Sequence, residues 1–153
     1  MAKRKIGILG GMGPEATVLM MQRIIAGTKA KDDRDHVPLI VDNNTQVPSR
    51  IDALIQGTGE DPGPVLAQMA RGLAAAGAEA LIMPCNTAHH YAPQIEAAAD
   101  VPFLNMVELT AQQIAAQVSP GARVGILASP AVRLTGLFDQ ALQALGLRAE
   151  YLA

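Results

Sequence analysis

The stretch KIGILGGMGPEAT, residues 5–17, decides the fold class of this chain. Its first part, residues 5–10, is a short apolar run that ends in glycines, which is typical of a buried strand. Pro14 follows where proline is favoured at the start of a helix, and Glu15 lies in the first helical turn. The stretch therefore predicts a strand, a glycine turn and a helix that runs to about Thr28.

The same order of elements continues along the chain. Apolar runs predict further strands at residues 37–44, 79–84, 101–106, from 122 and at 147–152, and helical patterns lie at 51–56, 64–76, 86–99, 107–118 and 131–145. A regular alternation of strands and helices predicts a parallel sheet with helices on both faces.

A second stretch, RVGILASPAVRLT at residues 123–135, repeats Gly-Ile-Leu followed by a turn of small residues and a helix. Any buried strand can contain these three residues, so a chance match stays open beside the alternative of two similar α/β units. We expect an α/β parallel-sheet sandwich with a complete N-terminal domain over residues 1–106. The first half of a second, pseudo-symmetric domain would then occupy residues 107–153.

Composition limits the kinds of partner. The formal net charge is −2 without a basic block, which argues against nucleic acid and anionic membranes as partners. No apolar segment reaches the roughly 18 residues that a transmembrane helix needs. The single cysteine has no partner within the sequence for a disulfide, and this fits a reducing compartment. We therefore expect a cytoplasmic protein that binds a small molecule.

The glycine turn admits three interpretations. Gly11, Gly13 and Ala16 have the G-x-G-x-x-A spacing of a dinucleotide-binding loop. However, Pro14 removes one N–H donor and Met12 places a long side chain over the turn, so a smaller anion such as one carboxylate fits better. The third interpretation is a purely structural tight turn. No cofactor is expected.

The motif MPCNTAHH, residues 83–90, holds the only cysteine. Cys85 follows a predicted strand at the edge of the sheet where ligands bind in open α/β folds. A helix that begins near Thr87 would favour the thiolate form, and Asn86 and Thr87 would supply donors beside the sulfur. The motif predicts an acid–base or nucleophilic cysteine next to an anion cradle.

Two other interpretations of Cys85 remain open at this point. Free cysteine is often a buried core residue, although its polar neighbours here argue against that role. Cys85 with His89 and His90 could begin a zinc site, but no further ligand pattern completes it. We expect no metal.

Together, GGMGPEAT, PSR and MPCNTAHH resemble the aspartate/glutamate racemase superfamily, most closely its aspartate racemase branch, and the resemblance covers the whole chain. It implies racemisation of an acidic amino acid, aspartate or glutamate, without pyridoxal phosphate or metal. In this family two cysteines, one per pseudo-symmetric domain, exchange the α-proton on opposite faces of the substrate. The resemblance also implies a homodimer.

Site roles follow from the same resemblance. It implies that Cys85 is the first acid–base group and that Asn86 and Thr87 bind the α-carboxylate. Met12 would line the pocket with the glycine loop. Arg50 would be the charged clamp for a substrate carboxylate, because a guanidinium matches a carboxylate with two parallel hydrogen bonds.

Two further residues are candidates for contact with the substrate. Ser129 lies in the equivalent turn of the second unit, where the family often has threonine, and Gln46 is a weaker pocket candidate. Each role has a structural alternative: Ser129 could cap the next helix, Arg50 could be a solvated surface charge, and Met12 could fill the core.

The sequence departs from the family pattern in its second half. The second cysteine, in a motif of the type Gly-Cys-Thr-Glu, and a later lysine are not among these 153 residues. We therefore expect a C-terminally truncated racemase with little activity of its own. The alternatives are a non-catalytic binder of dicarboxylates or amino acids, or another superfamily member such as a hydantoin racemase, an arylmalonate decarboxylase or a maleate isomerase.

Overall fold

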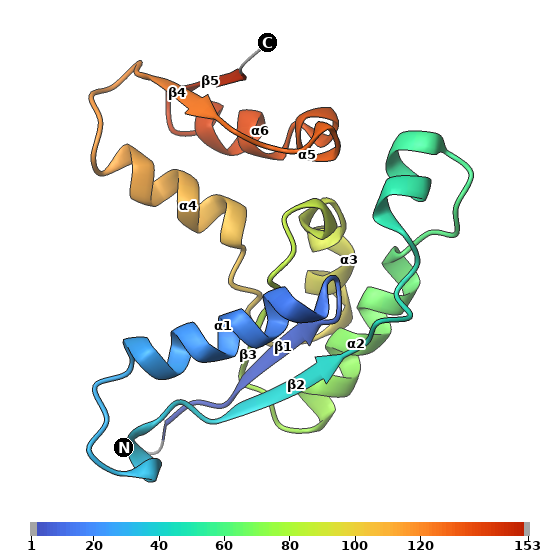
Figure 1. The fold of residues 1–153 in the computed structure, drawn as a ribbon, viewed down its shortest axis with the longest axis vertical. Coiled ribbons are helices and arrows are strands. Elements are labelled where there is room, and N and C mark those ends of the chain that lie inside the picture. The colour runs from blue at the N-terminus through green and yellow to red at the C-terminus, as the bar shows by residue number, and fades with distance from the viewer. Residues whose placement is uncertain (1–2, 152–153) are drawn as a thin grey trace.

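Two parallel sheets carry the strands in the computed structural model, which describes residues 3–151 (Figure 1). The first sheet has the order β2-β1-β3 and the second pairs β4 with β5. The strands are β1 (Ile6–Gly10), β2 (Leu39–Asn43), β3 (Ala80–Ile82), β4 (Arg123–Ile126) and β5 (Arg148–Tyr151). All pairings between these strands are parallel, which confirms the predicted α/β class.

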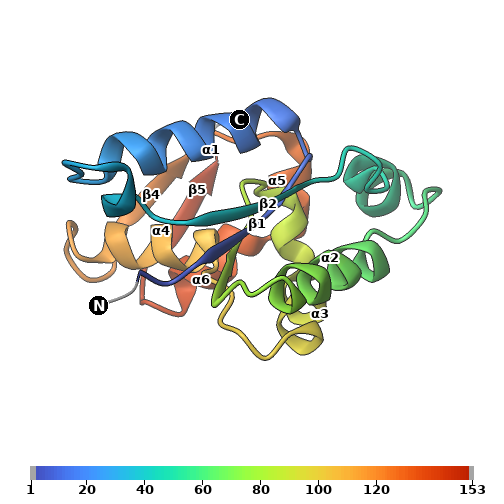
Figure 2. The same ribbon diagram turned by 90° about the horizontal axis from the view of Figure 1, so that it is seen from below.

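Helices connect the strands. The α-helices are α1 (Pro14–Gly27), α2 (Gly63–Ala75), α3 (Ala92–Ala98), α4 (Met106–Ala115), α5 (Pro130–Thr135) and α6 (Leu137–Gln143). Shorter helical turns are η1 (Asp33–Asp35), the π-helical η2 (Asp52–Gln56) and the 3₁₀-helical η3 (Thr87–Tyr91). Figure 2 shows α1 on one side of the first sheet and α2 with α3 on the other. Crossovers that leave the central β1 and β2 in opposite directions along the sheet put their helices on opposite faces when both have the usual right-handed sense.

The predicted strand at residues 101–106 is wrong. Only an isolated bridge forms there, between Leu81 and Phe103. Pro102 has no N–H that could donate to a neighbouring strand, although its carbonyl accepts a hydrogen bond from the N–H of Leu81 at 2.8 Å. Two residues after Phe103, the side chain of Asn105 already caps α4, which ends the extended segment.

The helix predicted at residues 131–145 is divided in two. Gly136 has a φ of +61°, in the left-handed region, and it ends α5 before α6 begins. In addition, α4 ends at Ala115, three residues earlier than residue 118, the predicted end.

The first core lies between α2 and the sheet. Leu66, Met69 and Leu73 recur at helical spacing along α2 and are buried with the strand residue Leu81. A Cβ at Gly7 would lie 2.8 Å from the Leu81 side chain and 3.1 Å from Leu73. Glycine at this strand position therefore lets α2 approach the sheet closely.

A second, smaller core joins α4, α6 and the β4–β5 sheet around Ala111, Leu142 and Leu147. The chain thus has one hydrophobic cluster on each sheet, and α4 leads from the first to the second (Figure 1). The division into domains at residue 106 stays a prediction. Among the helices of residues 3–151, none combines the length and the apolar character needed to cross a membrane.

Candidate functional site

A cavity of about 520 Å³ lies where chain segments that follow β1, β3 and β4 meet. Its lining consists of Met12 after β1, Pro84, Cys85, Asn86 and Thr87 after β3, Ile126, Leu127, Ala128 and Ser129 at the end of β4, and Val132 and Phe138 from the next two helices. The carboxyl ends of parallel strands are where open α/β folds bind ligands. Five of the seven predicted site residues, Met12, Cys85, Asn86, Thr87 and Ser129, line this one cavity.

The two walls of the cavity come from different sheets. β1 and β3 are neighbours in the first sheet, so their following loops meet at one edge, whereas the other wall follows β4. α5, which begins after Ser129, contacts both η3 and η2 (Figure 1). The cavity is therefore built from segments more than a hundred residues apart in sequence, Met12 and Ser129 among them.

Cys85 is half-buried at this cavity. Its N–H donates to the carbonyl of Met83 at 2.9 Å, which bends the chain directly after β3. A 3₁₀ turn, η3, follows at Thr87, so the expected helical start is present in a shorter form. The exposed Asn86 makes no side-chain hydrogen bond that caps this turn, and its amide is therefore free to meet a ligand.

His89 has a role that the sequence analysis missed. It is 2% exposed, its Nδ1 lies 2.7 Å from the carbonyl oxygen of Cys85, and its Nε2 accepts the N–H of Met106 at 3.1 Å. Because Nε2 accepts, the proton must lie on Nδ1, which donates to the carbonyl. Burial lowers the pKa of His89, while the bond to Cys85 and the charge of Glu108 oppose that shift.

This geometry argues against the zinc alternative for the motif. Both ring nitrogens of His89 are occupied by backbone groups, and His90 is exposed with its ring against Tyr91 at 5.1 Å. Over residues 3–151, no three His, Cys, Asp or Glu side chains are grouped so that they could hold a metal ion.

Thr17 was also missed, and it supports the glycine loop. The residue is 1% exposed, and its hydroxyl accepts the N–H of Gly11 at 3.0 Å and donates to the carbonyl of Gly13 at 3.3 Å. Gly11 has a φ of +93°, and a Cβ there would lie 2.3 Å from the Asn44 carbonyl. Gly11 thus lets the loop pack against the backbone after β2, and the next residue, Met12, lines the cavity.

Arg50 and Gln46 are not among the lining residues. The guanidinium of Arg50 donates to the carbonyls of Val47 at 3.3 Å and Pro48 at 2.9 Å, within its own loop. Gln46 is exposed, and its amide donates to Thr45 at 3.2 Å. No charged side chain lines the cavity in the described part of the chain.

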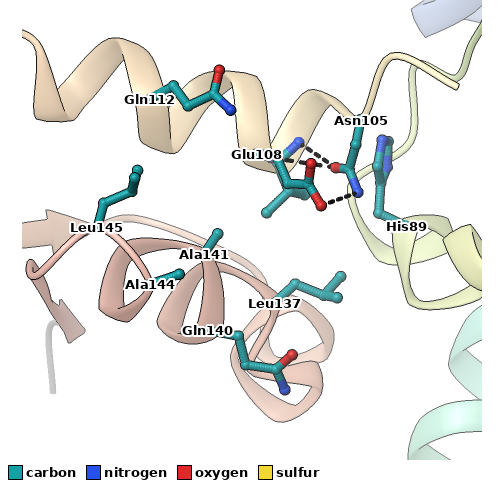
Figure 3. Close-up of a pocket in the computed structure, with 10 residues that line it drawn as sticks. His89, Asn105, Glu108, Gln112, Leu137, Gln140, Ala141, Ala144 and Leu145 are labelled. Atoms are coloured by element: carbon teal, nitrogen blue, oxygen red, sulfur yellow. Dashed lines mark hydrogen bonds between the residues drawn. The ribbon is translucent and has the colours of Figure 1, made fainter. Parts of the chain in front are cut away.

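A second cavity, of about 340 Å³, lies between α4 and α6 (Figure 3). Asn105 and Glu108 on one side are joined by a hydrogen bond of 3.4 Å, and Leu137 and Gln140 lie on the other. Its lining includes His89 but none of the seven predicted site residues. The two cavities therefore have different linings, and the candidate site is the cavity that contains Cys85.

Comparison with known proteins identifies the family of the chain. The model of the Asp/Glu/hydantoin racemase family matches residues 9–153, nearly the whole chain. The chain belongs to this racemase family. The match includes the cysteine loop and both walls of the cavity.

Individual relatives agree with the family. The broad specificity amino-acid racemase RacX of Bacillus subtilis is 28% identical over 92% of this chain and 61% of its own length. The aspartate racemase of Picrophilus torridus is 28% identical with a TM-score of 0.84, over 97% of this chain and 62% of its own. An aspartate racemase homologue from Pyrococcus horikoshii shares the fold, with a TM-score of 0.74 at 22% identity over 100% of this chain and 65% of its own. The chain thus spans about three fifths of the length of these family members.

Proposed function

We propose that this chain binds an acidic amino acid in the cavity beside Cys85, and that Cys85 acts as one acid–base group in cofactor-independent racemisation. The observation that carries the proposal is the convergence of Met12, Cys85, Asn86, Thr87 and Ser129 on one cavity in a member of the racemase family. The likeness to the aspartate racemase of Picrophilus torridus supports an acidic substrate.

The chemistry needs a base and a charge sink. In the proposed step, the Cys85 thiolate removes the α-proton and becomes a thiol, and the electron pair left on the α-carbon delocalises into the substrate carboxylate. Because this proton is very weakly acidic, the carboxylate must be held by preorganised donors. The amide of Asn86 and the hydroxyl of Thr87 are beside the sulfur in sequence and line the same cavity.

Completing the inversion requires a proton donor on the opposite face of the substrate. Cys85 is the only cysteine of the sequence, and the opposite wall contributes Ser129 among apolar residues. In the two-cysteine mechanism that we propose, the second thiol would therefore have to come from outside these 153 residues.

Arg50 is our candidate for the second substrate carboxylate. Its present hydrogen bonds are to neutral carbonyls of its own loop, and the η2 turn that follows contacts α5 at the far wall. A dicarboxylate would offer the guanidinium a stronger, charge-assisted pair of bonds than the two carbonyls do. We propose that Arg50 turns toward the cavity when substrate binds, and that Gln46 assists from the same loop.

A second candidate function is binding of small dicarboxylates without turnover, and the single thiol favours it. We also propose that the protein acts in the cytoplasm as a homodimer; light scattering with size-exclusion chromatography tests the dimer.

Calorimetric titration with both enantiomers of aspartate and glutamate, combined with alkylation of Cys85, tests the proposal. We expect binding of at least one acidic enantiomer, protection of Cys85 from iodoacetamide by that ligand, and loss of binding in Arg50→Ala. Binding without protection would favour a ligand away from the thiol. Absence of binding by all four amino acids would contradict the proposed racemase function for this chain.

A further inference from the structure

We infer that His89 is a positioning residue that holds the Cys85 backbone against the start of α4 and thereby sets the reach of the thiol into the cavity. Any effect of His89 on racemisation rests on the function proposed above. The positioning itself is tested by the alkylation rate of the Cys85 thiol, without substrate.

The argument begins with the two bonds of the imidazole ring. His89 donates to the carbonyl of Cys85 at 2.7 Å and accepts the N–H of Met106 at 3.1 Å. These two backbone groups lie on different segments, the cysteine loop and the first residue of α4. The buried ring of His89 thus joins the cysteine loop to α4, two segments that belong to different secondary-structure elements.

The second step concerns the helix that His89 meets. The first N–H groups of an α-helix have no partner within the helix. Asn105 accepts those of Val107 at 3.0 Å and Glu108 at 3.3 Å, and His89 accepts that of Met106. His89 therefore acts as part of the N-terminal cap of α4 although it lies 17 residues earlier in the chain.

The third step connects the cap to the cavity. α4 leads to β4, whose end forms the wall opposite Cys85. The ring is further held by Phe103, with ring centroids 5.4 Å apart. A displacement of His89 would therefore loosen the cysteine loop and its alignment with the opposite wall together.

Two substitutions separate the two bonds. An asparagine amide reaches the place of Nδ1 and can still donate to Cys85, whereas a glutamine amide reaches the place of Nε2 and can still accept from Met106. Because Cys85 is the only cysteine, native-state alkylation by iodoacetamide reports on it alone. His90→Gln, at the exposed neighbour, is the matched control.

We expect His89→Gln to raise the alkylation rate about fivefold, the factor that corresponds to one hydrogen bond of ordinary net strength. His89→Asn should raise the rate as well, because without the bond to Met106 the ring no longer holds Cys85 against α4, whereas His90→Gln should stay close to the original rate. A role in stability alone would lower the melting temperature of both His89 variants and leave their native alkylation rates unchanged. Native rates of both His89 variants equal to that of the unsubstituted protein would overturn the inference.

The unsubstituted protein offers an independent test if the variants fail to fold. Nitrogen-15 NMR of its histidine rings should find the His89 proton on Nδ1 and an unprotonated Nε2. A proton on Nε2 would rule out the bond from Met106. Altered alkylation without any amino-acid binding would leave the positioning intact and refute only the proposed function.

Discussion

The hydroxyl of Thr17, on α1, accepts a hydrogen bond from the N–H of Gly11 at 3.0 Å, and both groups are buried. A side chain of the helix thus holds the loop that precedes it, and Met12 of that loop lines the cavity. The shape of this part of the site depends on the contact between helix and loop.

We predict that Thr17→Val destabilises the protein by about 1–3 kcal/mol, because it leaves the buried N–H of Gly11 without an acceptor. Thr17→Ser keeps the hydroxyl and loses one methyl group, so its cost should be smaller, about 1 kcal/mol. Urea unfolding followed by circular dichroism measures both. Equal stability of the two variants would show that the hydroxyl does not hold the loop.

Gly11→Ala should cost more than an alanine at another glycine with positive φ. A Cβ at Gly11 would lie 2.3 Å from the Asn44 backbone, whereas a Cβ at Gly121 has no neighbour within 4 Å. The φ values are +93° and +78°, so both variants carry backbone strain of about 1–2 kcal/mol and only the first adds a clash. Thermal unfolding of the pair checks the prediction, and a similar loss for both would contradict it.

Because His89 is buried, the free energy of unfolding should depend on pH. Its pKa in the folded state is lowered below 6.5, chiefly by burial, so the unfolded chain binds the proton more readily. The free energy of unfolding should therefore fall as pH drops below 6.5, by at most about 1.4 kcal/mol per pH unit. Glu108 is the charged side chain that acts on the ring, whereas Cys85 meets it through its backbone carbonyl.

Comparison with His89→Gln isolates this contribution, because all other titrating groups are unchanged. Urea unfolding between pH 7.5 and 5 should give a shallower dependence for the variant. The same slope for both proteins would mean that His89 takes up its proton equally in the folded and unfolded states.

The hydroxyl of Tyr151 should lose its proton at a higher pH than an ordinary tyrosine, and it should stabilise the fold as long as it is protonated. Burial and the hydrogen bond from its hydroxyl to Asp139, 2.7 Å long, raise its pKa to about 12 from 10.0. This contribution is complete below pH 10 and is lost as pH rises through about 12. Tyr151→Phe should cost about 1 kcal/mol at neutral pH, since the ring under Arg133 is kept and the hydrogen bond is lost.

Ultraviolet titration of tyrosinate, with Tyr151→Phe as the reference for Tyr91, identifies the Tyr151 transition. A transition at the ordinary value of 10.0 would contradict the contact with Asp139.

The isolated chain should show little or no interconversion of L- and D-aspartate. One thiol can remove an α-proton and return it to the same face, so slow exchange with deuterated water is the expected trace of activity. Cys85→Ser should abolish that exchange. Full racemisation by the 153-residue chain that is lost in Cys85→Ser would defeat the two-cysteine proposal.

Local patterns in the sequence predicted most of the fold. The apolar run before Gly10, Pro14 at the start of α1 and the positive-φ glycine after α2 act within a few residues, so their effect can be read directly. Two predictions were wrong because of a single residue each. Pro102 prevented the strand predicted at residues 101–106, and Gly136 divided the helix predicted at residues 131–145.

The sequence by itself determined which chemical groups follow the strands, and a parallel topology brings such groups to one edge. A place after a strand predicted Cys85 with its neighbours Asn86 and Thr87, and the family resemblance added Met12 and Ser129; these five residues line one cavity. Only the tertiary structure decided that Thr17 holds the glycine loop, that His89 joins Cys85 to α4 and that Arg50 bonds to its own loop. These bonds depend on where separate segments pack, and neither spacing nor residue type specifies which buried N–H or carbonyl a side chain will meet.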